Sequence, residues 1–185
     1  MKTRERIYSI ATIVIIIDQI VKLLIRTKMK INTSIPIIPN IFNLTYVENK
    51  GAAFSILQDA TILLVIIGLI FLYLIDYYIK KEKKIDKLSI IALGLIIGGI
   101  IGNLVDRLLL HAVVDYLDFT LINFPIFNIA DTCITIGVVL FIICTIKEEI
   151  NNKKKVTIIE EVKEEKTTKK KTTKKKTKNV KKNKK

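Results

Sequence analysis

The residues of this chain that could do chemistry are acidic, amide and basic side chains within or just beside long apolar stretches. A charged group inside a lipid bilayer is costly, so such residues mark functional sites by default. The set consists of Asp18, Lys22, Asn103, Asp106, Arg107, Asp115, Asn128 and Asp131. Spacings of three and four residues place the members of each local group on one face of a helix. We therefore expect polar groups from separate segments to converge at one depth, near the outer leaflet.

The chemistry open to this set is that of paired carboxyl groups. Two carboxylates at close range cannot both ionise cheaply, so they share one proton. One can then act as general base on a water molecule while the other acts as general acid toward a carbonyl oxygen, which cleaves a peptide bond. Such a mechanism uses no metal ion and no cofactor, and we expect none here.

Other hydrolase signatures are missing from the sequence. His111 is the single histidine and belongs to no H-E-x-x-H motif, which disfavours a zinc protease. The chain contains no G-x-S-x-G nucleophile elbow, and Ser55 has no evident base.

Four apolar blocks must position these residues. Helices are expected over about Ile7–Ile25, Ala60–Ile79, Leu88–Leu108 and Ile126–Ile146. Each can cross the hydrocarbon layer, which is roughly 30 Å thick. The first block is not read as a signal peptide, because it is longer than the usual apolar region and no small-residue cleavage site follows it. The sequence therefore predicts an all-α membrane protein with four transmembrane helices.

The connections between these blocks carry further predictions. The stretch from Thr27 to Asp59 contains two prolines and an alternating segment, which indicates a small extracytoplasmic β-like element lying on the membrane. Asp115 is expected in the loop after the third helix. Glycines at 94, 98 and 102 recur every four residues, a spacing that allows another backbone to approach closely. Asp76 is interpreted as an interfacial charge near the inner end of the second helix.

Lysine and arginine positions predict the orientation. Three basic residues precede the first helix, and five lie between the second and third. The loop after the third helix has only Arg107 at its edge. By the positive-inside rule both termini are expected to be cytoplasmic, and the site is expected near the outer face of the membrane.

The C-terminal segment differs in composition from the rest. Of the formal net charge of +14, residues 147–185 carry +11, from 17 lysines and 6 glutamates. We expect a membrane domain over residues 1–147 and a disordered lysine-rich cytoplasmic tail over 148–185. The tail is expected to contact anionic lipid head groups, and nothing in it indicates specific recognition of nucleic acid.

Five blocks in this order resemble signal peptidase II, the lipoprotein signal peptidase of peptidase family A8. They are Asp18-Gln19-Ile20-Val21-Lys22, Asn49-Lys50-Gly51-Ala52-Ala53-Phe54-Ser55, Gly98 to Arg107, Val113-Val114-Asp115-Tyr116, and Phe127-Asn128-Ile129-Ala130-Asp131. Each block alone is a weak signal, whereas five ordered blocks in a chain with four apolar stretches are specific. The resemblance covers about residues 5 to 146.

The resemblance implies an aspartic endopeptidase that removes signal peptides from diacylglyceryl-modified prolipoproteins, cleaving before the lipid-modified cysteine. It assigns Asp115 and Asp131 to the catalytic pair. It assigns binding and supporting roles to Asp18, Lys22, Asn49, Gly51, Asn103, Asp106, Arg107 and Asn128. We expect a monomer without cofactor. One departure from the family pattern is His111-Ala112, where the family usually has a glycine, which would permit a positive φ.

Two alternatives remain open from the residues alone. One is a small membrane carrier that uses buried carboxylates, although its polar groups would need to extend through the bilayer. The other is a different class of intramembrane aspartic protease, which would place both aspartates inside spanning helices.

Overall fold

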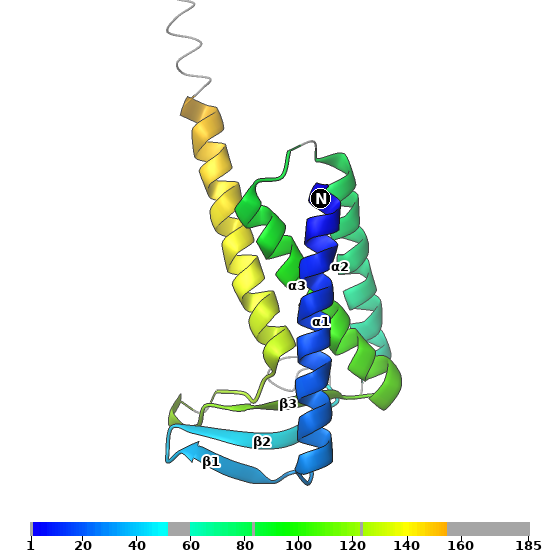
Figure 1. The fold of residues 1–185 in the computed structure, drawn as a ribbon, viewed down its shortest axis with the longest axis vertical. Helices are drawn as coiled ribbons and strands as arrows, with labels where there is room; N and C mark the ends of the chain where they lie inside the picture. The colour runs from blue at the N-terminus through cyan, green and yellow to red at the C-terminus, as the bar shows by residue number, and fades with distance from the viewer. Residues whose placement is uncertain (1, 52–59, 83, 123, 155–185) are drawn as a thin grey trace, which may run out of the picture. The chain divides into compact units, whose positions relative to one another are not determined.

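The computed structural model describes residues 2–51, 60–82, 84–122 and 124–154. Within these residues four helices are long and apolar enough to cross a membrane: α1 (Thr3–Lys28), α2 (Thr61–Lys81), α3 (Lys87–Leu110) and a fourth helix, Ile129–Lys154 (Figure 1). The expected four-helix membrane architecture is confirmed. The bounds of the fourth helix differ from those expected, since it begins at Ile129, not Ile126, and continues past Ile146 to Lys154. Its start is delayed because the backbone of Phe127 pairs with Leu117.

A small antiparallel sheet accompanies the helices, with strand order β1-β2-β3. The strands β1 (Ser34–Ile38) and β2 (Phe42–Asn49) confirm the β-like element expected between the first two helices. The third strand, β3 (Val113–Asp118), was not expected, and it corrects the placement of Asp115 in a loop. Asp115 instead pairs with Val47 of β2. A short 3-10 helix, η2 (Thr120–Ile122), follows β3.

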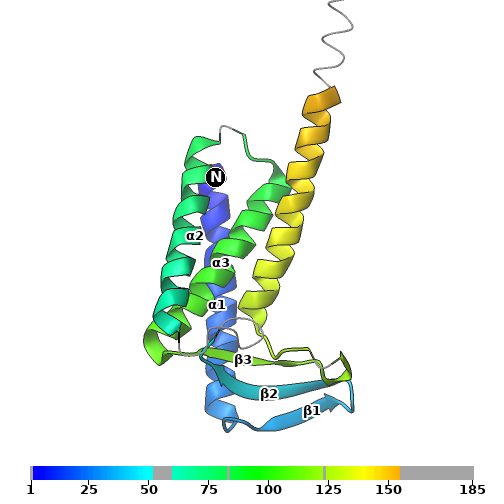
Figure 2. The same ribbon diagram turned by 180° about the vertical axis from the view of Figure 1, so that it is seen from behind.

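The sheet is anchored on the last turns of α1. Figures 1 and 2 show the three strands lying across the end of α1 that is opposite to the N-terminus. Ile25 of α1 packs there with Tyr46 of β2 and with Val114 and Tyr116 of β3, and all four side chains are buried. The sheet is therefore held against one end of the helix bundle.

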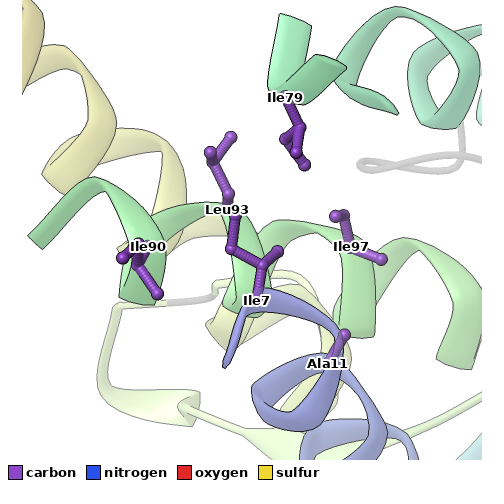
Figure 3. Packing of buried hydrophobic residues seen from close by; sticks show 6 residues of the cluster. All are labelled: Ile7, Ala11, Ile79, Ile90, Leu93 and Ile97. Carbon is purple, nitrogen blue, oxygen red and sulfur yellow. The ribbon is translucent and has the colours of Figure 1, made fainter. Parts of the chain in front are cut away.

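A second apolar cluster lies toward the other end of α1. Ile7 and Ala11 of α1 pack with Ile79 of α2 and with Ile90, Leu93 and Ile97 of α3 (Figure 3). Helix α3 is the most enclosed of the four spanning helices, because its residues are buried at intervals from Ser89 to Asp106, whereas α2 buries only Ile79. The exposed isoleucines and leucines of the other helices form the surface expected to face lipid.

The glycines of α3 allow close helix packing, as expected. A Cβ atom added to Gly94 would lie 2.7 Å from Ile10 of α1, and one added to Gly98 would lie 2.6 Å from Val14 of α1. On Gly102 it would lie 2.5 Å from a carboxyl oxygen of Asp18. The stripe thus packs α1 and also leaves space for an acidic side chain.

Side-chain and backbone caps define the ends of α3. Asp86 precedes the helix, and its carboxyl accepts hydrogen bonds from the backbone N–H groups of Leu88 and Ser89. His111 follows the helix in the left-handed conformation with φ 58° and ψ 14°, and its N–H donates to the carbonyl of Arg107. The position where the family usually carries glycine therefore does require a positive φ in this chain, and histidine adopts it.

The chain divides into two compact units, residues 1–142 and 143–185. The second unit contains the last turns of the fourth helix, where exposed Lys153 and Glu149 form an ion pair. Residues 155–185, which include most of the expected tail, and residues 52–59 lie outside the described part of the chain. In the first unit, Asp76 accepts a hydrogen bond from the hydroxyl of Tyr8 and pairs with Lys80.

Candidate active site

The carboxyl group of Asp115 is buried and held by two amides. Its side chain is 2% exposed. One oxygen accepts a hydrogen bond from Nδ2 of Asn128 at 2.6 Å, and the other accepts from Nδ2 of Asn49 at 3.0 Å. Asn49 lies near the end of β2, which pairs with β3, so the sheet itself brings the amide to the carboxyl group.

The carboxyl group of Asp131 lies in the first turn of the fourth helix. Oδ1 accepts a hydrogen bond from Nδ2 of Asn103 at 2.7 Å, and Oδ2 accepts from the backbone N–H of Asn128 at 3.2 Å. In return, Oδ1 of Asn128 accepts from the backbone N–H of Asp131 at 2.9 Å. These two reciprocal bonds form a capping box, in which Asn128 is the N-cap residue of the helix.

Asn128 consequently links the two aspartates. Because its side-chain oxygen is used in the helix cap, its Nδ2 faces the other way, toward Asp115. The same amide also donates to Oδ1 of Asn103 and to the carbonyl of Val114. One residue thus touches Asp115 with its side chain and Asp131 with its backbone, and this brings the two carboxyl groups into one site.

Lys22 supplies a buried positive charge behind this pair. Its ammonium group lies 2.9 Å from Asp18 and 3.0 Å from Asp106, and all three side chains are no more than 3% exposed. It also donates to Oδ1 of Asn103 at 2.9 Å. Since Oδ1 of Asn103 receives two donors, its Nδ2 is directed at Asp131. Lys22 therefore orients the amide that contacts the candidate catalytic carboxyl.

The carboxyl groups of Asp18 and Asp106 position backbone as well as Lys22. Asp18 accepts from the backbone N–H of Ala130 at 3.1 Å, and Asp106 accepts from that of Val114 at 3.0 Å. The first bond ties α1 to the start of the fourth helix, and the second ties α3 to β3. Each carboxyl therefore fixes the segment that carries one of the two candidate catalytic aspartates.

At the start of the fourth helix, each of the four backbone N–H groups of residues 128–131 has a hydrogen-bond acceptor. The N–H groups of Asn128 and Asp131 are satisfied in the capping box, that of Ala130 by Asp18, and that of Ile129 by the hydroxyl of Tyr116 at 3.4 Å. The first four N–H groups of a helix have no partner within the helix. Here α1, β3 and the helix itself provide an acceptor for each of these N–H groups.

Arg107 closes another side of the site. Its side chain donates to the carbonyl of Gly51 at 3.2 Å, and the N–H of Gly51 donates to Oδ1 of Asn49 at 2.9 Å. Because Asn49 in turn donates to Asp115, Arg107 is connected to that carboxyl through the end of β2. The rest of the sequence block that follows, residues 52–55, falls outside the described residues.

The environment of Asp115 favours its protonated form. Burial, together with the nearby charge of Asp131, raises the pKa of Asp115 from 3.8 to about 7. The amide donors of Asn49 and Asn128 and the charge of Lys22 oppose this rise. Near neutral pH a large share of the Asp115 carboxyl groups is therefore protonated.

The polar residues singled out from the sequence lie together. Hydrogen bonds or ion pairs connect Asp18, Lys22, Asn49, Gly51, Asn103, Asp106, Arg107, Asp115, Asn128 and Asp131 into one region at the sheet end of the helices. Two residues received no role from the sequence, Gln19 and Tyr116. The Gln19 amide donates to Asp18, Asp106 and the carbonyl of Gly102. A glutamine inside an apolar span was a signal of this role, because an amide in lipid needs partners.

Comparison with known proteins identifies the family. The family model described as signal peptidase (SPase) II matches residues 10–147. The chain belongs to the signal peptidase II family. It is therefore a bacterial multi-pass membrane protein and a protease, and a carrier is not favoured.

Similar proteins support the assignment of the chain to the signal peptidase II family. A lipoprotein signal peptidase of Halothermothrix orenii is 44% identical over 144 residues, which cover 77% of this chain and 97% of the relative. A bacterial membrane enzyme solved by the in meso method at 2.3 Å resolution is 40% identical, with a TM-score of 0.72, over 77% of this chain and 88% of its own. A second one, solved at 1.9 Å, is 41% identical with a TM-score of 0.68, over 75% and 90% of the two chains. The curated relative and the solved structures thus support the same family and the same fold.

Proposed function

We propose that this chain removes signal peptides from diacylglyceryl-modified prolipoproteins, and that it cleaves the bond before the lipid-modified cysteine. The catalytic pair is Asp115 and Asp131. The observation that carries the proposal is the connection of these two aspartates through Asn128, whose side chain donates to one and whose backbone donates to the other. Binding and supporting roles fall to the residues that hold this pair.

The two carboxyl groups take different roles in the reaction. Asp131 is ionised and takes a proton from the attacking water, while Asp115 is protonated and donates to the oxygen of the scissile carbonyl. The resulting neutral diol collapses when Asp131 returns its proton to the leaving nitrogen and Asp115 regains one from a hydroxyl group. Both carboxyls finish in their starting states. The raised pKa of Asp115, about 7, supports its role as the initial acid.

The lipid on the substrate explains why such a site belongs at a membrane surface. Two acyl chains hold the precursor in the bilayer, since each buried CH₂ contributes about 0.8 kcal/mol. The enzyme then needs to recognise little sequence beyond the lipid-bearing cysteine. The site lies near the outer face and both termini are cytoplasmic, as the distribution of lysine and arginine in the short loops favours.

The remaining partners follow from composition. The lysine-rich tail, residues 148–185, is a cytoplasmic segment separate from the membrane domain and contacts anionic lipid head groups. The membrane domain acts as a monomer without a cofactor.

A cleavage assay on one diacylated precursor peptide tests the function. Mass spectrometry should detect the released signal peptide and the lipidated fragment with the parent enzyme. Asp115→Asn and Asp131→Asn should each abolish cleavage while the protein still inserts and folds. Cleavage at near the parental rate by either variant would refute the catalytic pair.

A further inference from the structure

The free end of the sheet, on the side away from α1, presents an apolar surface. Six side chains that are between 41% and 68% exposed form what we name the apolar tip: Ile37, Ile38, Ile41, Leu121, Ile122 and Phe124. Ile37 and Ile38 lie at the end of β1 and Ile41 in the turn that follows it, whereas the other three come from the turn after β3. Figures 1 and 2 both show these two turns side by side. Two contacts join the two turns. The N–H of Leu121 donates to the carbonyl of Ile41, and the ring centroids of Phe119 and Phe42 are 4.9 Å apart.

The segments that form the apolar tip contain no charged residue. The chain is 26% charged, yet residues 31–47 and residues 119–130 include no Asp, Glu, Lys or Arg. A water-facing edge strand is normally protected by charged side chains, because an exposed apolar edge invites aggregation. Exposed isoleucines instead lie along β1, at Ile35, Ile37 and Ile38. Such a strand fits an apolar surrounding and not bulk water.

The depth of the sheet along α1 brings this surface to the bilayer. Helix α1 has 26 residues and is about 39 Å long at 1.5 Å per residue, whereas the hydrocarbon layer is roughly 30 Å thick. In a helix centred on that layer, Val21 lies inside the hydrocarbon and Ile25 at its edge. Both of these residues pack against the sheet. The sheet therefore overlaps the boundary between acyl chains and head groups.

We propose that the apolar tip is a lipid-inserting surface that enters the head-group and upper acyl region of the leaflet beside the active site. Lipid is the occupant that fits best, because the tip is continuous in depth with the lipid-facing helices and β1 exposes three isoleucines without a charged residue. Pro36 of β1 supports this, since a proline in an edge strand removes an outward N–H that lipid would leave without a partner. The tip thereby ties the sheet that carries Asp115 to the leaflet.

The chain has no tryptophan, so single-tryptophan variants give a signal without background. The full chain is reconstituted in phosphatidylcholine–phosphatidylglycerol vesicles as Ile37→Trp or Ile122→Trp. Lys30→Trp, an exposed position in the turn between α1 and β1, is the matched control at the opposite end of the sheet. Fluorescence is quenched by phospholipids with a nitroxide at the head group, at a shallow acyl position or at a deep one, and separately by aqueous iodide.

We expect Trp fluorescence at both tip positions to be blue-shifted, quenched most by the shallow acyl nitroxide, and several-fold less sensitive to iodide than the control. Iodide quenching equal to that of Lys30→Trp would overturn the proposal. So would protection from iodide without quenching by any lipid nitroxide, because a second copy of the protein would then cover the tip. Ile38→Trp and Leu121→Trp provide a second pair if either first variant does not fold. The result is independent of the proposed cleavage reaction.

Discussion

The side-chain amide of Asn128 lies 2.6 Å from the carboxyl group of Asp115, while the side-chain oxygen of the same residue caps the helix that carries Asp131. The two contacts use opposite ends of one amide. The orientation of the donor toward Asp115 is therefore a direct result of the helix cap, and substitutions at position 128 can separate capping from catalysis.

Asn128→Asp should preserve the fourth helix but stop the reaction. Aspartate is as good an N-cap residue as asparagine, but it cannot donate to Asp115 and adds a third carboxyl group beside the pair. We expect cleavage to fall by at least about 100-fold, within the range supplied by positioned acid–base groups. The assay is mass-spectrometric cleavage of a diacylated precursor, with thermal unfolding as the control. An Asn128→Asp enzyme with parental activity would show that the amide is not required.

The stability of the protein should depend on pH through Asp115. Its pKa is raised from 3.8 to about 7 in the folded protein, so the folded state binds more protons than the unfolded state between these values. The free energy of unfolding therefore falls as pH rises through this window and is flat above it. Asp115→Asn removes the titrating group, and its melting temperature should exceed that of the parent above about pH 7, with a difference that shrinks toward about pH 4. Thermal scans of both proteins in the same detergent across this range test the expectation.

The ionisation of Asp115 should also determine how the activity of the parent enzyme depends on pH. Because the reaction starts from a protonated Asp115, kcat/KM should decline as the pH rises through about 7. The measurement is initial cleavage rate at low substrate from about pH 5 to about pH 9. A rate that stays constant up to about pH 9 would contradict the assignment of Asp115 as the acid.

Lys22→Met should destabilise the protein severely. The substitution leaves the carboxyl groups of Asp18 and Asp106 buried without their shared cation, and breaking a buried ion pair costs about 3–5 kcal/mol. The matched control is the triple variant Lys22→Met, Asp18→Asn, Asp106→Asn, which removes the charges together. We expect it to recover part of the lost melting temperature, and no recovery would mean that packing, not charge, is the main contribution of Lys22.

Gly102→Ala should disturb the site from within α3. The added Cβ would lie 2.5 Å from a carboxyl oxygen of Asp18 and would displace it from Lys22 and from the N–H of Ala130. Gly68→Ala is the control, because the added Cβ there meets only the flexible side chain of Leu104, at 3.0 Å. We expect loss of activity and of melting temperature for Gly102→Ala, and a change within about 1 kcal/mol for Gly68→Ala. Equal effects would indicate a general response to alanine in these helices.

His111→Gly should stabilise the protein. A left-handed conformation costs about 1–2 kcal/mol for a residue with a side chain, whereas glycine loses only about 0.5–1 kcal/mol in chain entropy. We expect a rise in the free energy of unfolding of up to about 1 kcal/mol, with His111→Ala as the control that keeps the strain. Denaturation of all three proteins in one detergent provides the comparison, and a less stable glycine variant would contradict it.

The sequence predicted the helices and the members of the site better than it predicted their connections. Asp18 and Lys22 could be paired because a spacing of four residues is enough to place them on one helix face. Asp115 was assigned to a loop, since the partner of β3 lies in β2, far away in the sequence, and local pattern cannot reveal such a pairing. The capping box of Asn128 and Asp131 was missed because helix ends are the least reliable part of such predictions. Gln19 was passed over because its three acceptors come from α1 and α3 together.

The saturation of the fourth helix's first turn has a consequence for inhibitors. Helix N-termini commonly bind anions through free N–H groups, but the four N–H groups of residues 128–131 are already engaged. An anionic group of an inhibitor that bound at this helix N-terminus would lie beside carboxyl groups and would find no free backbone N–H group there. Compounds that imitate the tetrahedral stage with an uncharged hydroxyl should therefore bind far more tightly than phosphonates of the same shape.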